Sequence, residues 1–132
     1  MSLSGVSSGG NDIFLIKFNS ADGSEEWVEQ MGTSGNDEGY DVAVDESENV
    51  YVTGTTTGSL DGNTEFGHDE DLFLVKFTSD GNKEWTKQIV TAFAYDEHGG
   101  VATDLSGNIY ISGTTTGDLF ATSPGFFVPF LI

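Results

Sequence analysis

Carboxylates are the side chains of this sequence with the greatest capacity for chemistry. Asp and Glu make up 22 of its 132 residues, against four Lys and no Arg, and the formal net charge is −18. The acidic pair Asp37-Glu38 recurs as Asp96-Glu97, and residues 58–70 carry further acids. We expect these groups to share one face of the molecule. The candidate ligand-binding residues on that face are Asp37, Glu38, Asp61, Asp69, Asp96 and Glu97.

Two kinds of metal site are compatible with such a face. Ca²⁺ takes about six to eight oxygen ligands, although neither residues 19–23 nor 61–65 match the calcium-loop pattern D-x-[DN]-x-[DN]-G. A His with carboxylates can ligate a transition metal instead. The candidates for a metal site are Asp61, His68, Asp69 and Asp71. We expect a solvated acidic rim and no cofactor, with a calcium site as the alternative.

The same residues do not predict a catalytic centre. Thr55–Thr57 and Thr114–Thr116 offer hydroxyl groups, but no neighbouring His would act as their base. Glycosidases use paired carboxylates, yet the acidic pair recurs along this chain, and catalytic pairs are rarely duplicated. We therefore expect a non-catalytic protein. The alternative is a calcium-dependent hydrolase or lyase that acts on polysaccharide, or a fragment of one.

The charge balance excludes some partners. Nucleic acid attracts Lys and Arg, so we expect no nucleic-acid binding by this anionic chain.

We also expect no membrane insertion, because the apolar stretch at 126–132 is far shorter than the roughly 20 residues of a membrane span. The first ten residues lack the pattern of a signal peptide. The absence of Cys excludes disulfides and thiolate metal sites.

An internal repeat is the strongest signal in the chain. Residues 12–18 and 71–77 lie 59 positions apart and are identical at five of seven positions. Residues 49–60 and 108–119 have the same spacing and are identical at eight of twelve positions. Each period contains four short runs of β-branched and aromatic residues separated by Gly, Asn, Asp and Ser, which predicts four antiparallel strands. We expect an all-β fold of four-stranded β-propeller blades, about two per chain.

These motifs resemble a known family. The patterns D-[IL]-F-L-[IV]-K-F, D-G, E-W, D-E and N-[VI]-Y-[VI]-[TS]-G-T-T, between Asp12 and Leu119, are similar to the SBBP class of β-propeller repeat, which is related to NHL repeats. The second copy departs from the first at residues 98–100. The resemblance implies a propeller fold and a secreted or cell-surface setting in bacteria or archaea. It implies no catalytic residues.

The repeat also predicts how the chain is divided. We expect an N-terminal tail at 1–11, two repeats at 12–70 and 71–119, and the start of a third repeat or a closing strand at 120–132. If the strands follow the usual propeller order, from the axis outward, one full blade spans 38–89. An outer half-blade precedes this blade, and an inner half-blade follows it.

Several repeated residues are expected to be structural. They are Lys17, Lys76, Trp27, Trp85, Gly54 and Gly113. The two Lys stand inside apolar runs, so we expect them to extend to solvent or to pair with a carboxylate such as Asp12 or Asp71. For the two Trp we expect packing between blades rather than stacking on sugars.

Two blades do not close a propeller ring, which has about four to eight blades. Either the chain is a fragment of a longer protein, or identical chains complete one another's half-blades by strand exchange. With two blades per chain, about three or four chains would give a closed ring. We expect such a homo-oligomer, and a function as a scaffold or as a binding surface for an unidentified protein or carbohydrate ligand.

Overall fold

The regular elements of the described chain are strands and one short 3₁₀ turn. The computed structural model describes residues 3–4, 9–63, 70–91, 96–116 and 119–120. The strands are β1 (Leu3–Ser4), β2 (Ile13–Phe18), β3 (Glu25–Met31), β4 (Asp37–Val44), β5 (Val50–Thr56), β6 (Asp71–Phe77), β7 (Lys83–Thr91), β8 (Asp96–Thr103), β9 (Ile109–Thr115) and β10 (Leu119–Phe120). The 3₁₀ turn η1 (Leu60–Gly62) follows β5. Among the described residues, no helix has the length and apolar character that crossing a membrane requires.

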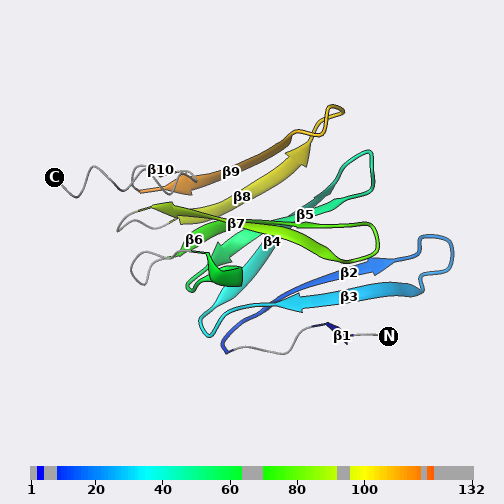
Figure 1. Ribbon diagram of the computed structural model, residues 1–132, viewed down its shortest axis with the longest axis horizontal. Coiled ribbons are helices and arrows are strands. Elements are labelled where there is room, and N and C mark those ends of the chain that lie inside the picture. The colour runs from blue at the N-terminus through cyan, green and yellow to red at the C-terminus, as the bar shows by residue number, and fades with distance from the viewer. Residues whose placement is uncertain (1–2, 5–8, 64–69, 92–95, 117–118, 121–132) are drawn as a thin grey trace.

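The central sheet contains a complete propeller blade. Its strand order is β10-β7-β6-β5-β4 (Figure 1), and β4, β5 and β6 each pair antiparallel with the next strand along the chain. The antiparallel pair β2–β3 and the antiparallel pair β8–β9 lie on opposite sides of this blade in Figure 1. The prediction of an all-β fold with four-stranded blades, about two per chain, is confirmed.

Local sequence explains the turns between these strands. Gly23 in the β2–β3 turn and Gly81 in the β6–β7 turn have φ angles of 73° and 86°, which Gly adopts without a Cβ clash. In the β4–β5 turn, the Asp45 carboxylate accepts backbone hydrogen bonds from the residues two and four positions later, and Asp104 does the same in the β8–β9 turn. Because these contacts are local, both repeats form the same turns.

The core lies between the central blade and β2. Alternate residues of β6 point into it, as a strand with one face on the core requires. The buried cluster consists of Ile13, Val50, Val52, Leu60, Phe73, Val75 and Phe77, with Leu15, Trp27 and Met31 packed against it. Ile13 and Leu15 belong to β2, so the outer half-blade is packed onto the full blade face to face. This stacking is the arrangement of neighbouring blades in a propeller.

Two short strands extend the sheets beyond the predicted elements. β1 lies within the segment 1–11, which we expected to be a tail, and pairs parallel to β3 with Leu3 opposite Val28. β10 pairs antiparallel to β7 with Leu119 opposite Thr91. Residues 121–132 lie outside the described residues, so a third repeat at this position stays a prediction.

Candidate functional site

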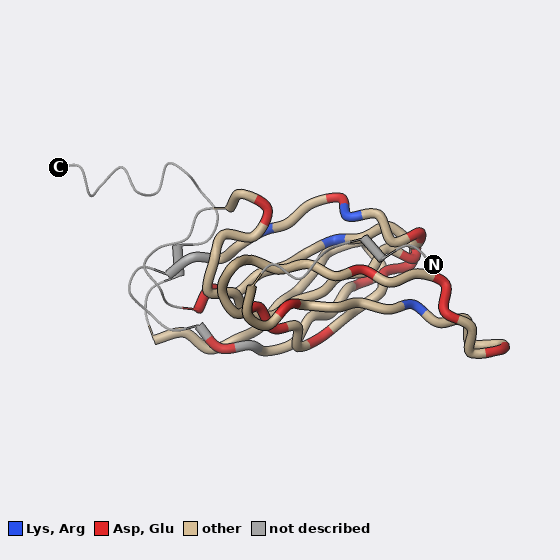
Figure 2. The backbone as a smooth tube through the Cα atoms, turned by 90° about the horizontal axis from the view of Figure 1, so that it is seen from below, with Lys and Arg blue, Asp and Glu red and all other residues tan. Residues whose placement is uncertain are grey.

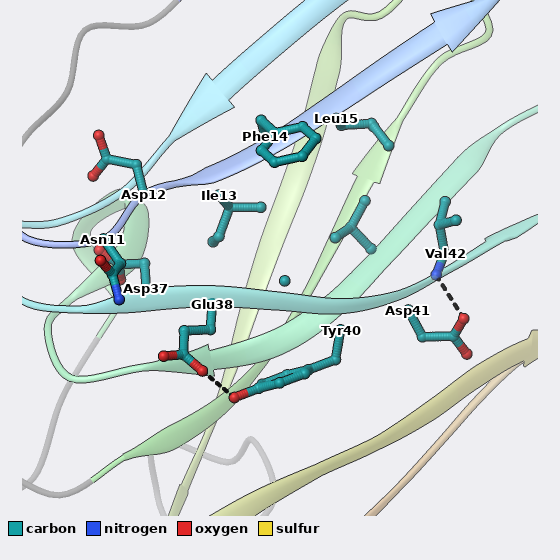
Figure 3. A pocket seen from close by; sticks show the side chains of 12 residues that line it. Asn11, Asp12, Ile13, Phe14, Leu15, Asp37, Glu38, Tyr40, Asp41 and Val42 are labelled. Atoms are coloured by element: carbon teal, nitrogen blue, oxygen red, sulfur yellow. Dashed lines mark hydrogen bonds between the residues drawn. The ribbon is translucent and has the colours of Figure 1, made fainter.

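A groove between β2 and β4 brings acidic and aromatic side chains together. Its volume is about 540 Å³. Among the residues that line it are Ile13, Phe14 and Leu15 from β2 and Glu38, Tyr40 and Asp41 from β4 (Figure 3). The Tyr40 hydroxyl donates a hydrogen bond to Glu38, and this bond, followed by burial, raises the pKa of Tyr40 above its ordinary value. One wall of the groove is therefore apolar and the other is acidic.

Asp37 also lines this groove, but it is buried in the fold, with 1% of its surface exposed. Its carboxylate accepts hydrogen bonds from the backbone N–H of Thr33 at 2.6 Å, from the Thr33 hydroxyl at 3.0 Å and from the Thr56 hydroxyl. These contacts tie the β3–β4 connection to β5. Asp37 thus differs from the exposed rim residue that we expected, because the alternation along β4 turns it inward.

Asp61 is held by a cation and a hydroxyl group. The Nζ of Lys83 lies 2.8 Å from one of its carboxylate oxygens, and the Thr86 hydroxyl donates to the other. Burial opposes the charged form of Asp61, but the bonds from Lys83 and Thr86 outweigh it, so the pKa of this carboxyl is lowered. The structure therefore gives Asp61 a role in joining η1 to β7.

The other metal candidates do not form a ligand set in the described structure. Asp71 is buried, and it accepts a 2.9 Å hydrogen bond from the amide of Gln88. His68 and Asp69 lie outside the described residues. Across the part of the chain that the structure describes, no group of three or more His, Asp or Glu side chains is placed to hold a metal ion.

The second acidic pair stands at the start of β8. Glu97 is exposed and lies opposite Thr114 of β9, and the backbone of Asp96 pairs with Thr115. β4 and β8 begin at the same end of the molecule (Figure 1), so Glu38 and Glu97 lie at the same end. Figure 2 shows Asp and Glu along the whole fold, with few Lys among them. The acidic surface is therefore broad rather than gathered in one cleft.

The repeated lysines form ion pairs across strands of their own sheets. The pairs are Lys17 with Glu26 and Lys76 with Glu84, each with an N–O distance of 2.7 Å. These partners differ from Asp12 and Asp71, the carboxylates that we expected. The register explains the difference, because each Lys lies opposite a Trp, Trp27 or Trp85, and the residue before that Trp is the Glu.

Trp27 connects the outer half-blade to the full blade. Its Nε1 donates a 2.9 Å hydrogen bond to the carbonyl oxygen of Ser79 in the β6–β7 turn. Its ring also covers Gly81, where an added Cβ would lie 2.8 Å from the ring. Trp85 makes a different contact, a tilted ring pair with Tyr51 whose centroids are 6.2 Å apart. The contact of Trp27 crosses between blades, and that of Trp85 stays within one blade.

Gly54 and Gly113 are positions where paired strands approach closely. A Cβ on Gly54 would overlap the carbonyl oxygen of Glu38, and a Cβ on Gly113 would lie 2.6 Å from the carbonyl oxygen of Glu97. Each carbonyl belongs to the inner strand that pairs with the strand of the Gly, next to an irregularity in the register. The two repeated Gly therefore allow the inner strands to bulge.

One repeated carboxylate motif was not among the predicted site residues. Asp45 accepts a 2.9 Å hydrogen bond from the Tyr51 hydroxyl, and Asp104 accepts one of 3.0 Å from Tyr110. Burial, with the bond to Asp45, raises the pKa of Tyr51 to about 12. The recurrence of Asp, Asn and Tyr with the same spacing in both repeats was the sequence signal for this motif.

Comparison with known families agrees with this repeated geometry. A family model described as SBBP, a β-propeller repeat, matches residues 26–61 and 84–121, which together exceed half of the chain. The chain belongs to the SBBP β-propeller repeat family. The resemblance of its motifs to SBBP repeats is thereby confirmed. A search of curated proteins found no match to the chain.

Each matched SBBP segment combines parts of two blades. The first begins in the outer strand β3 and continues through the inner strands β4 and β5 of the next blade, and the second runs from β7 through β8 and β9. The sequence repeat therefore begins and ends at different strands from the structural blade. As a consequence, a chain of two such repeats has one full blade and two halves.

Asp45→Asn is expected to destabilise this SBBP chain by about 2 kcal/mol at neutral pH, since four hydrogen bonds to a charged acceptor are disturbed. Burial disfavours the charge of Asp45, but the bonds from Asn49, Tyr51 and Ser47 outweigh it and lower its pKa below the ordinary 3.8. Its contribution is therefore present above that value and is lost as the pH falls through the folded-state pKa.

Urea unfolding followed by Trp fluorescence, at about pH 7 and about pH 3, measures this difference. The gap between the native chain and the variant should narrow at the lower pH. Asp104→Asn is the matched control, because it removes the same contacts from the exposed β8–β9 turn, and it should have the smaller effect. A gap for Asp45→Asn that is unchanged between the two pH values would contradict the assignment.

Proposed function

We propose that the chain is a non-catalytic β-propeller module that acts as a scaffold or as a binding surface for a protein or carbohydrate ligand. In this proposal it works in a secreted or cell-surface setting, and copies of the chain complete one another's blades. The observation that carries the proposal is that each of the two half-blades lacks the other half of its blade among the described strands. Apolar side chains that a finished propeller buries are exposed on both of them.

The carboxylates support a non-catalytic role. Asp37 is enclosed by Thr33 and Thr56, and Asp61 is paired with Lys83. These groups have structural partners within the fold. A surface formed by stacked blades and rimmed with acids suits the binding of a ligand better than the transfer of a proton.

The exposed apolar residues support completion by further blades. The large hydrophobic residues exposed on the half-blades are Phe14 and Phe18 on β2, Leu105 in the β8–β9 turn, and Tyr110 on β9. Exposed apolar patches of this kind mark interaction surfaces on soluble proteins. Three of the four residues lie on strands, so strands of a further copy are the partner that this proposal assigns to them.

Light scattering after size exclusion is the experiment that tests this function. We expect a discrete particle of about three or four times the chain mass of 14.1 kDa. The fraction assembled should rise with salt, since the charge of −18 on each copy opposes association and salt screens it. A chain that stays monomeric at both low and high salt would refute completion by copies of itself.

A further inference from the structure

The two repeats place the same strand in two environments. In β6, Phe73 and Phe77 are 0% and 1% exposed, whereas the equivalent Phe14 and Phe18 of β2 are 71% and 58% exposed. The residue types are the same, so the neighbours cause the difference. β6 lies between β5 and β7, but within the described structure β2 pairs with β3 alone. One edge of β2 is therefore open.

β9 shows the same contrast with its equivalent strand. All seven residues of β5 are buried, whereas those of β9 are half-buried or exposed. Tyr51 of β5 is 3% exposed and the equivalent Tyr110 is 57% exposed. β5 lies between β4 and β6, while β9 pairs with β8 as its one partner among the described strands. The open edge of β9 is the one that in β5 pairs with β6.

We propose that β9 of one copy pairs antiparallel with β2 of a second copy, so that the two half-blades form one four-stranded blade. This inference rests on the proposed function, in which copies complete one another. The full blade supplies the template for the register. Its central pairs are Tyr51 with Lys76, Thr53 with Leu74, and Gly54 with Phe73. Moved through the 59-residue repeat, they become Tyr110 with Lys17, Ser112 with Leu15, and Gly113 with Phe14.

The β2–β3 turn carries a second, independent sign of the same interface. Trp27 of one blade covers Gly81 in the turn of the next blade. The repeat equivalents of these two residues are Trp85 and Gly23. A Cβ on Gly23 would have no described atom within 4 Å, so the turn that should receive a Trp is uncovered. In the assembly, Trp85 in the full blade of the first copy lies over Gly23 in the shared blade, which the second copy contributes.

The groove beside β2 lies where the inner strand of the added hairpin would stand. On the side of β4 away from β2, β8 packs against β4: the N–H of Val101 donates to Asp41 at 2.9 Å, and the Thr103 hydroxyl donates to the carbonyl oxygen of Val44 at 3.0 Å. On the β2 side, the groove of about 540 Å³ occupies the corresponding position. The β8 strand of the first copy would lie along this groove of the second copy, and the β9 strand of the first copy would pair with the open edge of β2.

Pairs of introduced cysteines test the register, because the native chain has no Cys. Ser112→Cys and Leu15→Cys chains are mixed, oxidised and separated on a non-reducing gel. Residues directly opposite each other in an antiparallel pair have Cα atoms about 4.5–5.5 Å apart, which a disulfide spans. We expect a covalent dimer from this mixture, at a yield at least about tenfold above that of the control.

The control mixes Ser112→Cys with Lys17→Cys, which lies on the same face of β2 but two residues out of register. That offset moves the Cα atoms to roughly 8 Å apart, beyond the reach of a disulfide. Equal dimer yields from the two mixtures would overturn the register. An oligomer by light scattering with no cross-linked dimer would overturn the β9–β2 pairing and leave the oligomeric module standing. A monomer by light scattering would overturn both.

Discussion

Phe73→Ala is expected to lower the free energy of unfolding by about 3–5 kcal/mol, because it empties the space of a fully buried aromatic ring in a packed core. Phe14→Ala changes the equivalent residue of the other repeat, which is exposed on the open half-blade. In the dissociated chain it should cost less than about 0.5 kcal/mol, as surface substitutions do. Urea unfolding of the dilute protein at low salt measures both values.

Of the same two variants, Phe14→Ala should have the larger effect when the association between copies is measured. Burying a Phe side chain contributes about 1.5–3 kcal/mol. If Phe14 is buried when β9 of another copy docks, Phe14→Ala should therefore weaken each contact between copies by about 10-fold to 100-fold. Light scattering across a concentration series measures this. Unimpaired assembly of Phe14→Ala would show that β2 is not the edge that another copy covers.

Gly54→Ala is expected to destabilise the chain by about 3 kcal/mol or more, because the added Cβ would overlap the carbonyl oxygen of Glu38 and lie 2.8 Å from the ring of Phe73. Gly54 lies on β5, which is paired on both sides. The backbone of β4 would have to move, and the pairing of these two strands would be disturbed with it. Thermal unfolding followed by circular dichroism reports the loss.

Gly39→Ala is the matched control for this substitution. Gly39 lies directly opposite Gly54 across the same strand pair. A Cβ on Gly39 would meet the Cγ2 of Ile13 at 3.1 Å and the Cγ1 of Val52 at 3.9 Å. Both contacts are with side-chain atoms that can shift, so the cost should stay below about 1 kcal/mol. Equal losses from the two variants would mean that the approach of Glu38 does not explain the Gly at position 54.

The repeated sequence predicted the strands, their order and the blade. The reason is that these features depend on local signals: Asp-Gly pairs at the hairpins, β-branched and aromatic runs between them, and the recurrence of both at one spacing. The same signals predicted the half-blades, since the order of strands along the chain begins in the middle of a blade. β1 and β10 were not predicted, because strands of two residues carry no such pattern.

The candidate site was predicted less completely. The composition identified carboxylates as the residues to consider, but the sequence does not distinguish a carboxylate on the rim from one held inside. Asp37 and Glu38 are neighbours of the same type and both line the groove, yet Asp37 is buried among hydroxyl groups while Glu38 is only half-buried. Whether a carboxylate of β4 is exposed or buried depends on which residues of the strand face inward and on the loop containing Thr33, which closes over Asp37. Both features are set by tertiary packing.

The sequence by itself determined that this protein is built of propeller repeats, because hairpins and strand order follow from contacts between residues close in the chain. Tertiary structure alone decided which members of each repeated pair are buried. Phe73 and Phe14, or Tyr51 and Tyr110, have the same type and the same local structure, but one of each pair is covered and the other is exposed. Burial depends on neighbouring strands, and two repeats supply both neighbours of a strand only in the central blade.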